Sequence, residues 1–224
     1  MKMIETFEDY KTQRYEKLEL EFLQKVGEDL KENIYAIRKF FLEEITAAIK
    51  TACEVQKLEN KICAYISISF LNSSLFENNP KFQIDFYNEE WVYGESWLSS
   101  RFSADFLFKY WQEFKFNALN ENFFIRSRIS KVEIKSLFWG TLDKLTYLLA
   151  CYAKYFAYRV NYYNEFDELQ KAENFYITCG TYLDWQERIF ANLPEIDLLN
   201  PDDNEDTTFR PVRKKFIDKK VFTI

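Results

Sequence analysis

Apolar residues recur at steps of three and four along residues 131–163, and this spacing places them on one face of an α-helix. Ser130 and Glu133 have the spacing of a capping box, in which each side chain bonds the backbone N–H of the other residue. The pattern therefore predicts a long central helix that begins after Ser130. Gly140 costs such a helix about 1 kcal/mol relative to Ala, so we expect it to permit a close helix crossing.

A second long helical pattern runs from Ile4 to about Leu58. A straight helix of this length would reach roughly 75 Å at 1.5 Å per residue, which is too long for a compact domain of this size. We therefore expect the helix to break or bend near Gly27.

Strand periodicity replaces helical periodicity after residue 61. Apolar residues alternate with other residues over 62–71 and again over 81–86, with an Asn-rich and Ser-rich connection between the two runs. We expect an antiparallel pair of strands over about 62–87. Two strands alone are marginally stable in water, so their apolar face must lie on the helices or a third strand must join them.

Two further helical segments follow from the pattern. Ser103 is a suitable N-cap for a helix that runs to about Leu119. Seven-residue spacing of apolar side chains predicts another helical segment after residue 168, interrupted where Gly180 ends one piece and Thr181 caps the next. The apolar residues that mark this segment are Leu169, Tyr176, Leu183 and Phe190.

The C-terminal region changes character twice. Residues 195–206 contain six acidic and no basic residues, and residues 210–220 contain six basic residues and one acidic residue. Residues 216–224 are rich in aromatic and β-branched residues, so they are a candidate strand for the small sheet. A free basic tail would instead suit an anionic surface, although the adjacent acidic run would compete for it.

The predicted fold class is α+β and predominantly α. We expect a helical core around the central helix (131–163) and a small antiparallel sheet (about 62–87), open to extension by the C-terminal strand. The predicted organisation is a single helical domain over 1–194 with an inserted β-hairpin, followed over 195–224 by an acidic loop and a basic strand or tail. Four Gly and four Pro among 224 residues support long helices over a turn-rich all-β fold.

The four cysteines show no metal-binding spacing, and each has apolar neighbours: Cys53, Cys63, Cys151 and Cys179. Because the acidic N-terminus also has no secretory pattern, we expect reduced, buried thiols in a cytoplasmic protein. Only nine residues separate Lys144 from Lys154, whereas a membrane span needs roughly 20 apolar residues, so we expect no span. The abundance of aromatic residues, Lys, Asn and Ile gives a bacterial-type composition that is typical of an A/T-rich genome.

The chain contains no histidine and carries a net charge of −6. The absence of histidine excludes Ser-His and Cys-His nucleophile pairs and histidine metal sites. Catalysis would therefore have to use carboxylates, Lys, Tyr or Cys. The negative net charge opposes binding to a nucleic-acid backbone, which needs clustered Lys and Arg. We therefore expect no cofactor and no catalytic residues, although enzyme activity stays open.

Carboxylates at i and i+3 on helices are the one enzyme-like pattern, since a Mg²⁺ site for a phosphorylated ligand would use them. With 36 acidic residues in 224 positions, chance alone gives about six such pairs. No Gly-rich phosphate loop accompanies any of them. A Mg²⁺-dependent helical enzyme acting on a phosphorylated small molecule is therefore one alternative. A ligand-sensing module with an aromatic pocket is the other.

The favoured hypothesis is a non-catalytic protein-binding factor, such as an adaptor, an inhibitor or an immunity-type protein. Rigid aromatic side chains are enriched at binding hot spots, and nearby carboxylates would attract a basic partner. Two aromatic and acidic segments meet this description, and their candidate binding residues are Trp91, Tyr93, Trp97, Tyr182, Asp184 and Trp185. A competing interpretation buries these Trp residues in the core. Homo-oligomerisation stays open.

Overall fold

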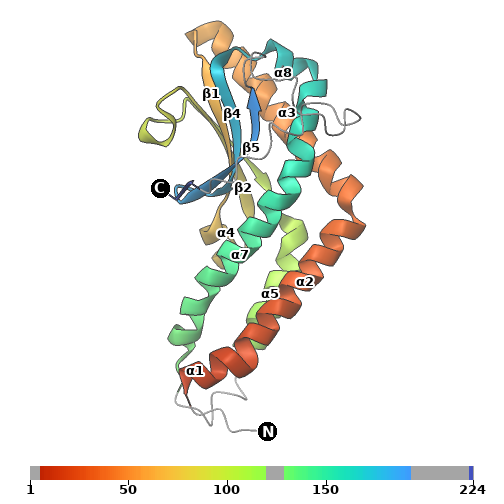
Figure 1. Ribbon diagram of the computed structural model, residues 1–224, viewed down its shortest axis with the longest axis vertical. Helices are drawn as coiled ribbons and strands as arrows, with labels where there is room; N and C mark the ends of the chain where they lie inside the picture. Colours follow the sequence, from red (N-terminus) through yellow and green to blue (C-terminus); the bar gives the residue numbers. More distant parts are fainter. Residues whose placement is uncertain (1–5, 120–128, 193–221, 224) are drawn as a thin grey trace, which may run out of the picture.

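A computed structural model describes residues 6–119, 129–192 and 222–223, and its elements form a sheet at one end and a stem of helices at the other (Figure 1). Helices α2, α5 and α7 run along the stem, and α3 and α7 cover one face of the sheet. The fold is α+β with more helix than strand, as predicted.

The helices begin and end as follows: α1 Phe7–Tyr10, a π-helical turn Lys11–Tyr15, α2 Glu16–Glu32, α3 Ile34–Glu59, α4 Asn72–Phe76, α5 Phe108–Ala118, α7 Lys131–Ala157 and α8 Asn164–Glu168, with 3₁₀ turns at Trp91–Tyr93, Asp105–Leu107 and Tyr158–Tyr162. The strands are β1 Cys63–Phe70, β2 Lys81–Tyr87, β3 Leu98–Ser103, β4 Lys171–Thr181, β5 Trp185–Asn192 and β6 Phe222–Thr223.

The predicted central helix is α7, and its predicted start is confirmed. Its predicted end at residue 163 is wrong, because α7 ends at Ala157 and a 3₁₀ turn follows at Tyr158–Tyr162. Ser130 and Glu133 form the capping box: the Glu133 N–H donates to the Ser130 hydroxyl oxygen at 3.2 Å, and the Ser130 N–H donates to the Glu133 carboxylate at 2.8 Å. The expected role of Gly140 is wrong. Among the described residues, no atom of a neighbouring element lies within 4 Å of the position its Cβ would occupy, so Gly140 does not mark a close helix crossing there.

The N-terminal helical pattern does break, but at Asn33 and not at Gly27. Gly27 lies inside α2, and Asn33 separates α2 from α3 with φ −100° and ψ 19°. The Asn33 side-chain amide donates to the Asp29 carbonyl at 3.1 Å. Asn is a helix breaker for this reason, because its short side chain competes for the backbone of the preceding turn.

The sheet has six strands in the order β3-β2-β1-β4-β5-β6. The predicted hairpin is confirmed, because β1 and β2 pair antiparallel with Ile68 opposite Ile84. β1 also pairs with β4 in parallel, while β2–β3, β4–β5 and β5–β6 are antiparallel. The C-terminal strand joins this sheet as β6, with Phe222 opposite Gln186 at the β5 edge, and the rest of the region 195–224 lies outside the described residues.

The helical segment predicted after residue 168 is wrong. α8 ends at Glu168, and residues 171–192 form the β4–β5 hairpin. Phe175, Ile177 and Cys179 alternate into the core, which is the period of a strand. Seven-residue spacing fits one face of a helix, but here Leu183 lies exposed in the turn. Gly180 does not cap a helix. It sits in β4, where an added Cβ would lie 2.1 Å from the Trp185 carbonyl oxygen.

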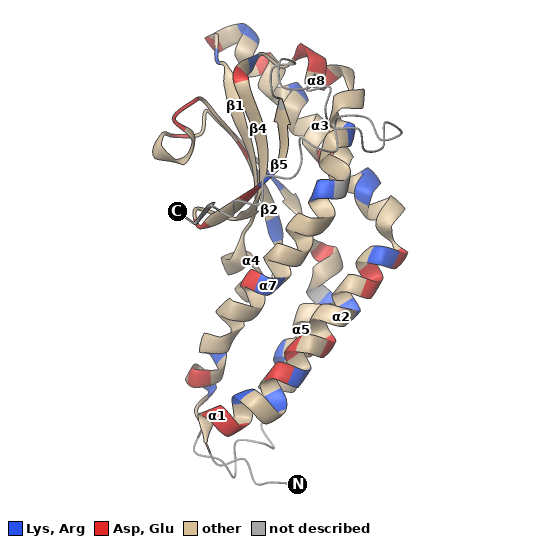
Figure 2. Cartoon of the chain, viewed as in Figure 1, with Lys and Arg blue, Asp and Glu red and all other residues tan. Residues whose placement is uncertain are grey.

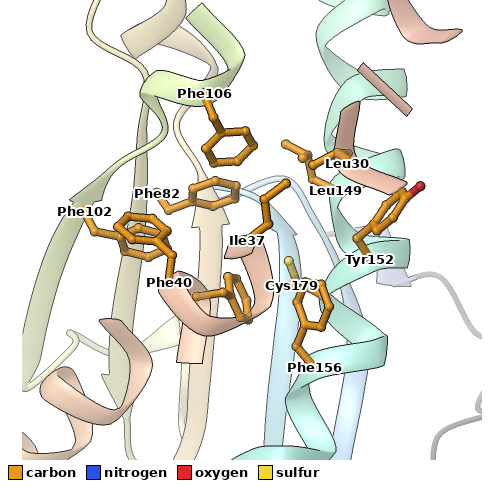
Figure 3. A pocket seen from close by; sticks show the side chains of 12 residues that line it. Leu30, Ile37, Phe40, Phe82, Phe102, Phe106, Leu149, Tyr152, Phe156 and Cys179 are labelled. Carbon is orange, nitrogen blue, oxygen red and sulfur yellow. The ribbon is translucent and has the colours of Figure 1, made fainter. Parts of the chain in front are cut away.

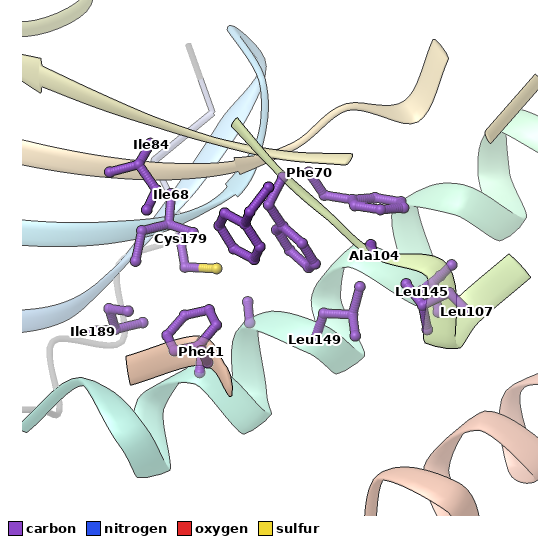
Figure 4. Packing of buried hydrophobic residues seen from close by; sticks show 14 of the residues in the cluster. Phe41, Ile68, Phe70, Ile84, Ala104, Leu107, Leu145, Leu149, Cys179 and Ile189 are labelled. Carbon is purple, nitrogen blue, oxygen red and sulfur yellow. The ribbon is translucent and has the colours of Figure 1, made fainter. Parts of the chain in front are cut away.

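One hydrophobic cluster joins the helices to the sheet (Figure 4). At the sheet, Ile68, Phe70 and Ile84 point toward α7, which contributes Leu145 and Leu149. In the stem the core is aromatic, with Phe22 stacked on Phe114 at 4.9 Å between ring centroids. None of the helices described in the structure has the length and apolar character that crossing a bilayer requires.

Candidate functional site

The sheet face opposite the helices is polar. Strand side chains alternate between the two faces, so the neighbours of the core residues point away from α7. These polar residues are nevertheless buried, each between 1% and 4% exposed: Ser67, Ser69, Gln83, Asp85, Thr178 and Gln186. Buried polar groups are costly unless they are hydrogen-bonded, so their partners decide whether this face is stable.

Asp85 is held by a hydrogen-bond network across β2 and β3. The Gln83 side-chain amide donates to both carboxylate oxygens, at 3.0 and 2.9 Å, and the Ser99 hydroxyl donates to one of them. Arg101 Nε donates to the Gln83 oxygen at 2.7 Å. Burial raises the pKa of Asp85, while the hydrogen bonds from Ser99 and Gln83 lower it.

A second network links β1, β4 and β5 on the same face. The Thr178 hydroxyl donates to Ser67 Oγ at 3.1 Å, and Ser67 donates to Gln186 Oε1 at 3.2 Å. Gln186 Nε2 donates to Ser69 Oγ at 3.1 Å and to the Thr181 carbonyl at 3.0 Å. These contacts satisfy one another, so we interpret the centre of the face as structural.

A row of stacked side chains crosses the face beside these networks. Trp91 stacks on Tyr65 with ring centroids 4.9 Å apart, and Tyr65 stacks on Tyr176 at 5.4 Å. The Arg188 guanidinium lies 4.4 Å from the Tyr176 ring centroid. We call these four residues the aromatic ladder. It ties loop 88–97, which connects β2 to β3, to strands β1, β4 and β5.

Trp91 holds its ring in the ladder at a conformational cost. Its φ is 50°, in the left-handed region that bulky side chains avoid. Strain of this kind costs on the order of 1–3 kcal/mol and persists where surrounding contacts enforce it, which is often at functional sites. The stacking on Tyr65 holds the Trp91 ring, and backbone hydrogen bonds to Asn88 and from Gly94 hold its backbone.

Loop 88–97 projects from the polar side of the sheet (Figure 1). Tyr93 lies on it and is 89% exposed. Glu89, Glu90 and Glu95 are exposed on the same loop, which contains no basic residue (Figure 2). The loop therefore presents one large aromatic side chain among three carboxylates.

Trp97 anchors the other end of the loop. Its ring packs against Phe86 with centroids 5.5 Å apart and lies against the hydrophobic core. Its backbone N–H donates to the Phe86 carbonyl at 3.0 Å. Of the three aromatic residues predicted in this segment, Tyr93 is thus the exposed one. Trp91 and Trp97 hold the loop in place.

The second predicted segment lies at the other end of the sheet, in the β4–β5 turn, so the structure does not bring the two segments together. Tyr182 and Asp184 are exposed. Burial raises the pKa of Tyr87, and the charges of Asp85 and of the Tyr182 phenol raise it further. Trp185 instead faces α7, with its ring 6.2 Å from that of Tyr147.

Sequence reasoning missed the sheet residues that support the loop. Tyr65, Tyr176 and Arg188 come from three strands, and two of those strands had been predicted as helix. The polar face of the sheet could have been predicted from β1 and β2, because Ser67, Ser69 and Asp85 fall on one face of an alternating pattern. Such a polar face is expected on a one-sided sheet, but its pairing with β4 and β5 depends on strand order.

An apolar cavity lies where α2, α3, α7 and the sheet meet (Figure 3). Its lining includes Phe40, Phe102, Phe106 and Tyr152, and its volume is about 30 Å³. An apolar cavity that takes up benzene measures roughly 150 Å³. This cavity is therefore too small for a ligand of that size.

The other chemical groups in the described part of the chain give no second candidate site. Burial raises the thiol pKa of all four cysteines, to about 12 for Cys179, so they are not poised as thiolates. Cys151 is only half-buried, which differs from the expectation of four buried thiols. Within the ranges that the structure covers, no three Cys, Asp or Glu side chains lie close enough to hold a metal ion.

Comparisons with protein-family models, with curated proteins and with solved structures found no match to this chain.

Proposed function

We propose that this protein is a non-catalytic binding factor, of the adaptor, inhibitor or immunity type, that recognises a basic partner protein through loop 88–97. The observation that carries the proposal is Tyr93, whose side chain is 89% exposed beside Glu89, Glu90 and Glu95. Tyr is favoured at interfaces because it supplies a large contact area for the loss of few rotatable bonds.

The loop is pre-organised for binding. Trp91 in the aromatic ladder and Trp97 against Phe86 fix its two ends. A surface that is already ordered loses less conformational entropy when a partner docks, so more of the contact energy is retained as affinity.

The charge of the loop selects the kind of partner. Three carboxylates without a basic residue attract Lys and Arg and repel acidic surfaces, and the net charge of −6 acts in the same direction at longer range. We therefore expect association to slow as salt is added, because exposed charges are screened beyond about 8 Å at physiological ionic strength. The alternatives of a Mg²⁺-dependent enzyme and a ligand sensor have no comparable observation in their favour among the described residues.

The test is the substitution Tyr93→Ala, with Tyr35→Ala as the matched control. Tyr35 is 72% exposed on α3, so both variants remove an exposed phenol. Proteins that the wild type captures from its native host are identified, and their dissociation constants are measured for all three chains. We expect Tyr93→Ala to weaken binding at least tenfold and Tyr35→Ala to leave it unchanged.

Urea unfolding of each variant separates binding from folding. Both substitutions remove exposed side chains, so the unfolding midpoints should stay close to that of the wild type. Equal affinities for the Tyr93 and Tyr35 variants would reject loop 88–97 as the binding surface.

A further inference from the structure

Loop 88–97 leads directly into β3, and β3 is an edge strand of the sheet. We infer that the partner binds as an extended basic segment that adds a strand to the free edge of β3, next to the loop. This inference rests on the proposed function and specifies the partner chemistry of the same site. Strand addition of this kind takes its affinity from main-chain hydrogen bonds and its specificity from neighbouring side chains.

The pairing of β3 with β2 identifies the backbone groups at the free edge. The Ala104 N–H donates to the Pro80 carbonyl at 2.8 Å, so residue 104 faces β2. In an antiparallel ladder, residues alternate between facing the neighbouring strand and facing away from it. Ser99, Arg101 and Ser103 therefore direct their N–H and C=O groups away from β2.

This edge is accessible and regular. Ser99 and Arg101 are exposed, and the register from Leu98 opposite Phe86 to Ser103 opposite Lys81 contains no shift. Within the described part of the chain, no backbone group bonds to the outer edge of β3. Proteins guard free edges with prolines, bulges or inward-pointing charges. β3 contains neither a proline nor a bulge, and Arg101 is its one inward-pointing charge.

Arg101 is the one charged side chain on β3, and its contacts turn it away from the edge. Its Nε donates to Gln83 on the polar face. The hydrogen bonds from Ser99 and Gln83 lower the pKa of the buried Asp85, and the Arg101 charge lowers it by a smaller amount. The guanidinium thus offsets Asp85 on the sheet face, while the Arg101 backbone remains at the edge.

The loop carboxylates select a basic strand over an acidic one. Glu89, Glu90 and Glu95 belong to the loop that enters β3 at Leu98. Glu95 is the loop carboxylate nearest to β3 in the sequence, three residues before Leu98. A strand laid along β3 and continued past Leu98 runs toward this end of the loop, so Lys or Arg side chains near its end would meet opposite charge. Like charge at that position would oppose binding by a similar amount.

The experiment compares Arg101→Pro with Arg101→Ala. Both variants lose the guanidinium, and only the proline also loses the outward N–H. Proline is tolerated at an edge position whose N–H faces solvent, so both chains should unfold at similar urea concentrations. If Arg101→Pro fails to fold, Ser99→Pro against Ser99→Ala repeats the comparison at the neighbouring outward position.

The probe is a capped eight-residue peptide of alternating Lys and Val, with an alternating Glu and Val peptide as the charge control. We expect Arg101→Pro to bind the Lys peptide at least tenfold more weakly than Arg101→Ala. The Lys peptide should also slow hydrogen exchange at the amides of residues 99, 101 and 103, and the Glu peptide should not. Equal binding by the two Arg101 variants, or equal binding of the two peptides, would overturn the inference.

The captured partner separates this inference from the proposed function. If Tyr93→Ala weakens binding of that partner while the two Arg101 variants bind it equally, loop 88–97 is the binding surface and strand addition is wrong. If Tyr93→Ala has no effect either, the proposed function fails as well.

Discussion

The sheet around Asp85 changes the pKa of its side chain. It is 1% exposed on the face away from the helices, and its hydrogen bonds come from Gln83 and Ser99. Burial disfavours the charged form, so it raises the pKa of this carboxyl, and the hydrogen bonds recover only part of the shift. The ionised carboxylate is therefore stabilised less in the folded state than in water.

This shift predicts a pH dependence of stability. Because the folded-state pKa is raised, the stabilisation from Asp85 is fully present below the unfolded-state value of about 3.9 and is lost as the pH rises through the folded value. Lowering the pH from 7 toward 4 should therefore stabilise the wild type relative to Asp85→Asn, which does not titrate. Urea unfolding of both chains across this range measures the difference. Parallel pH profiles would show that Asp85 titrates as it does in the unfolded chain.

The elements could be predicted from the sequence where two independent signals agreed. The capping box at Ser130 and the apolar spacing after it fixed the start of α7, and the alternation in β1 and β2 fixed the hairpin. In the β4–β5 hairpin, spacing by seven residues predicts a helix, whereas the β-branched and aromatic residues between Phe175 and Thr181 favour a strand. β4 is also buried at every position from Ile177 to Thr181, so the alternation of exposed and buried positions is lost there.

Two glycines in different elements give opposite predictions for the same substitution. Gly140→Ala should stabilise the protein by about 1 kcal/mol, because Ala is the better helix former and the added Cβ meets no neighbouring element. Gly180→Ala should destabilise it by about 1–3 kcal/mol, because the added Cβ would lie 2.1 Å from the Trp185 carbonyl oxygen. Urea midpoints of the two variants test both claims. A loss of stability at Gly140 would reveal a neighbour that the structure does not show.

At the scale of the whole molecule, strand order assembles the site. β1 lies between β2 and β4, so Tyr65 meets both Trp91 of the loop and Tyr176 of a strand more than 100 residues away. The candidate loop was recognisable from its own composition, whereas the ladder that supports it was not. Composition identifies aromatic residues, but only the fold decides that Trp97 anchors the loop and Tyr93 is exposed.

Site-specific photocross-linking tests whether Tyr93 contacts the partner directly. The photoreactive residue p-benzoylphenylalanine replaces Tyr93 in one chain and Tyr35 in another, and each is irradiated with the captured partner. We predict a covalent adduct from position 93, reduced when salt is raised, and none from position 35. An adduct from position 35 alone, or from neither position although the partner stays bound, would contradict the claim.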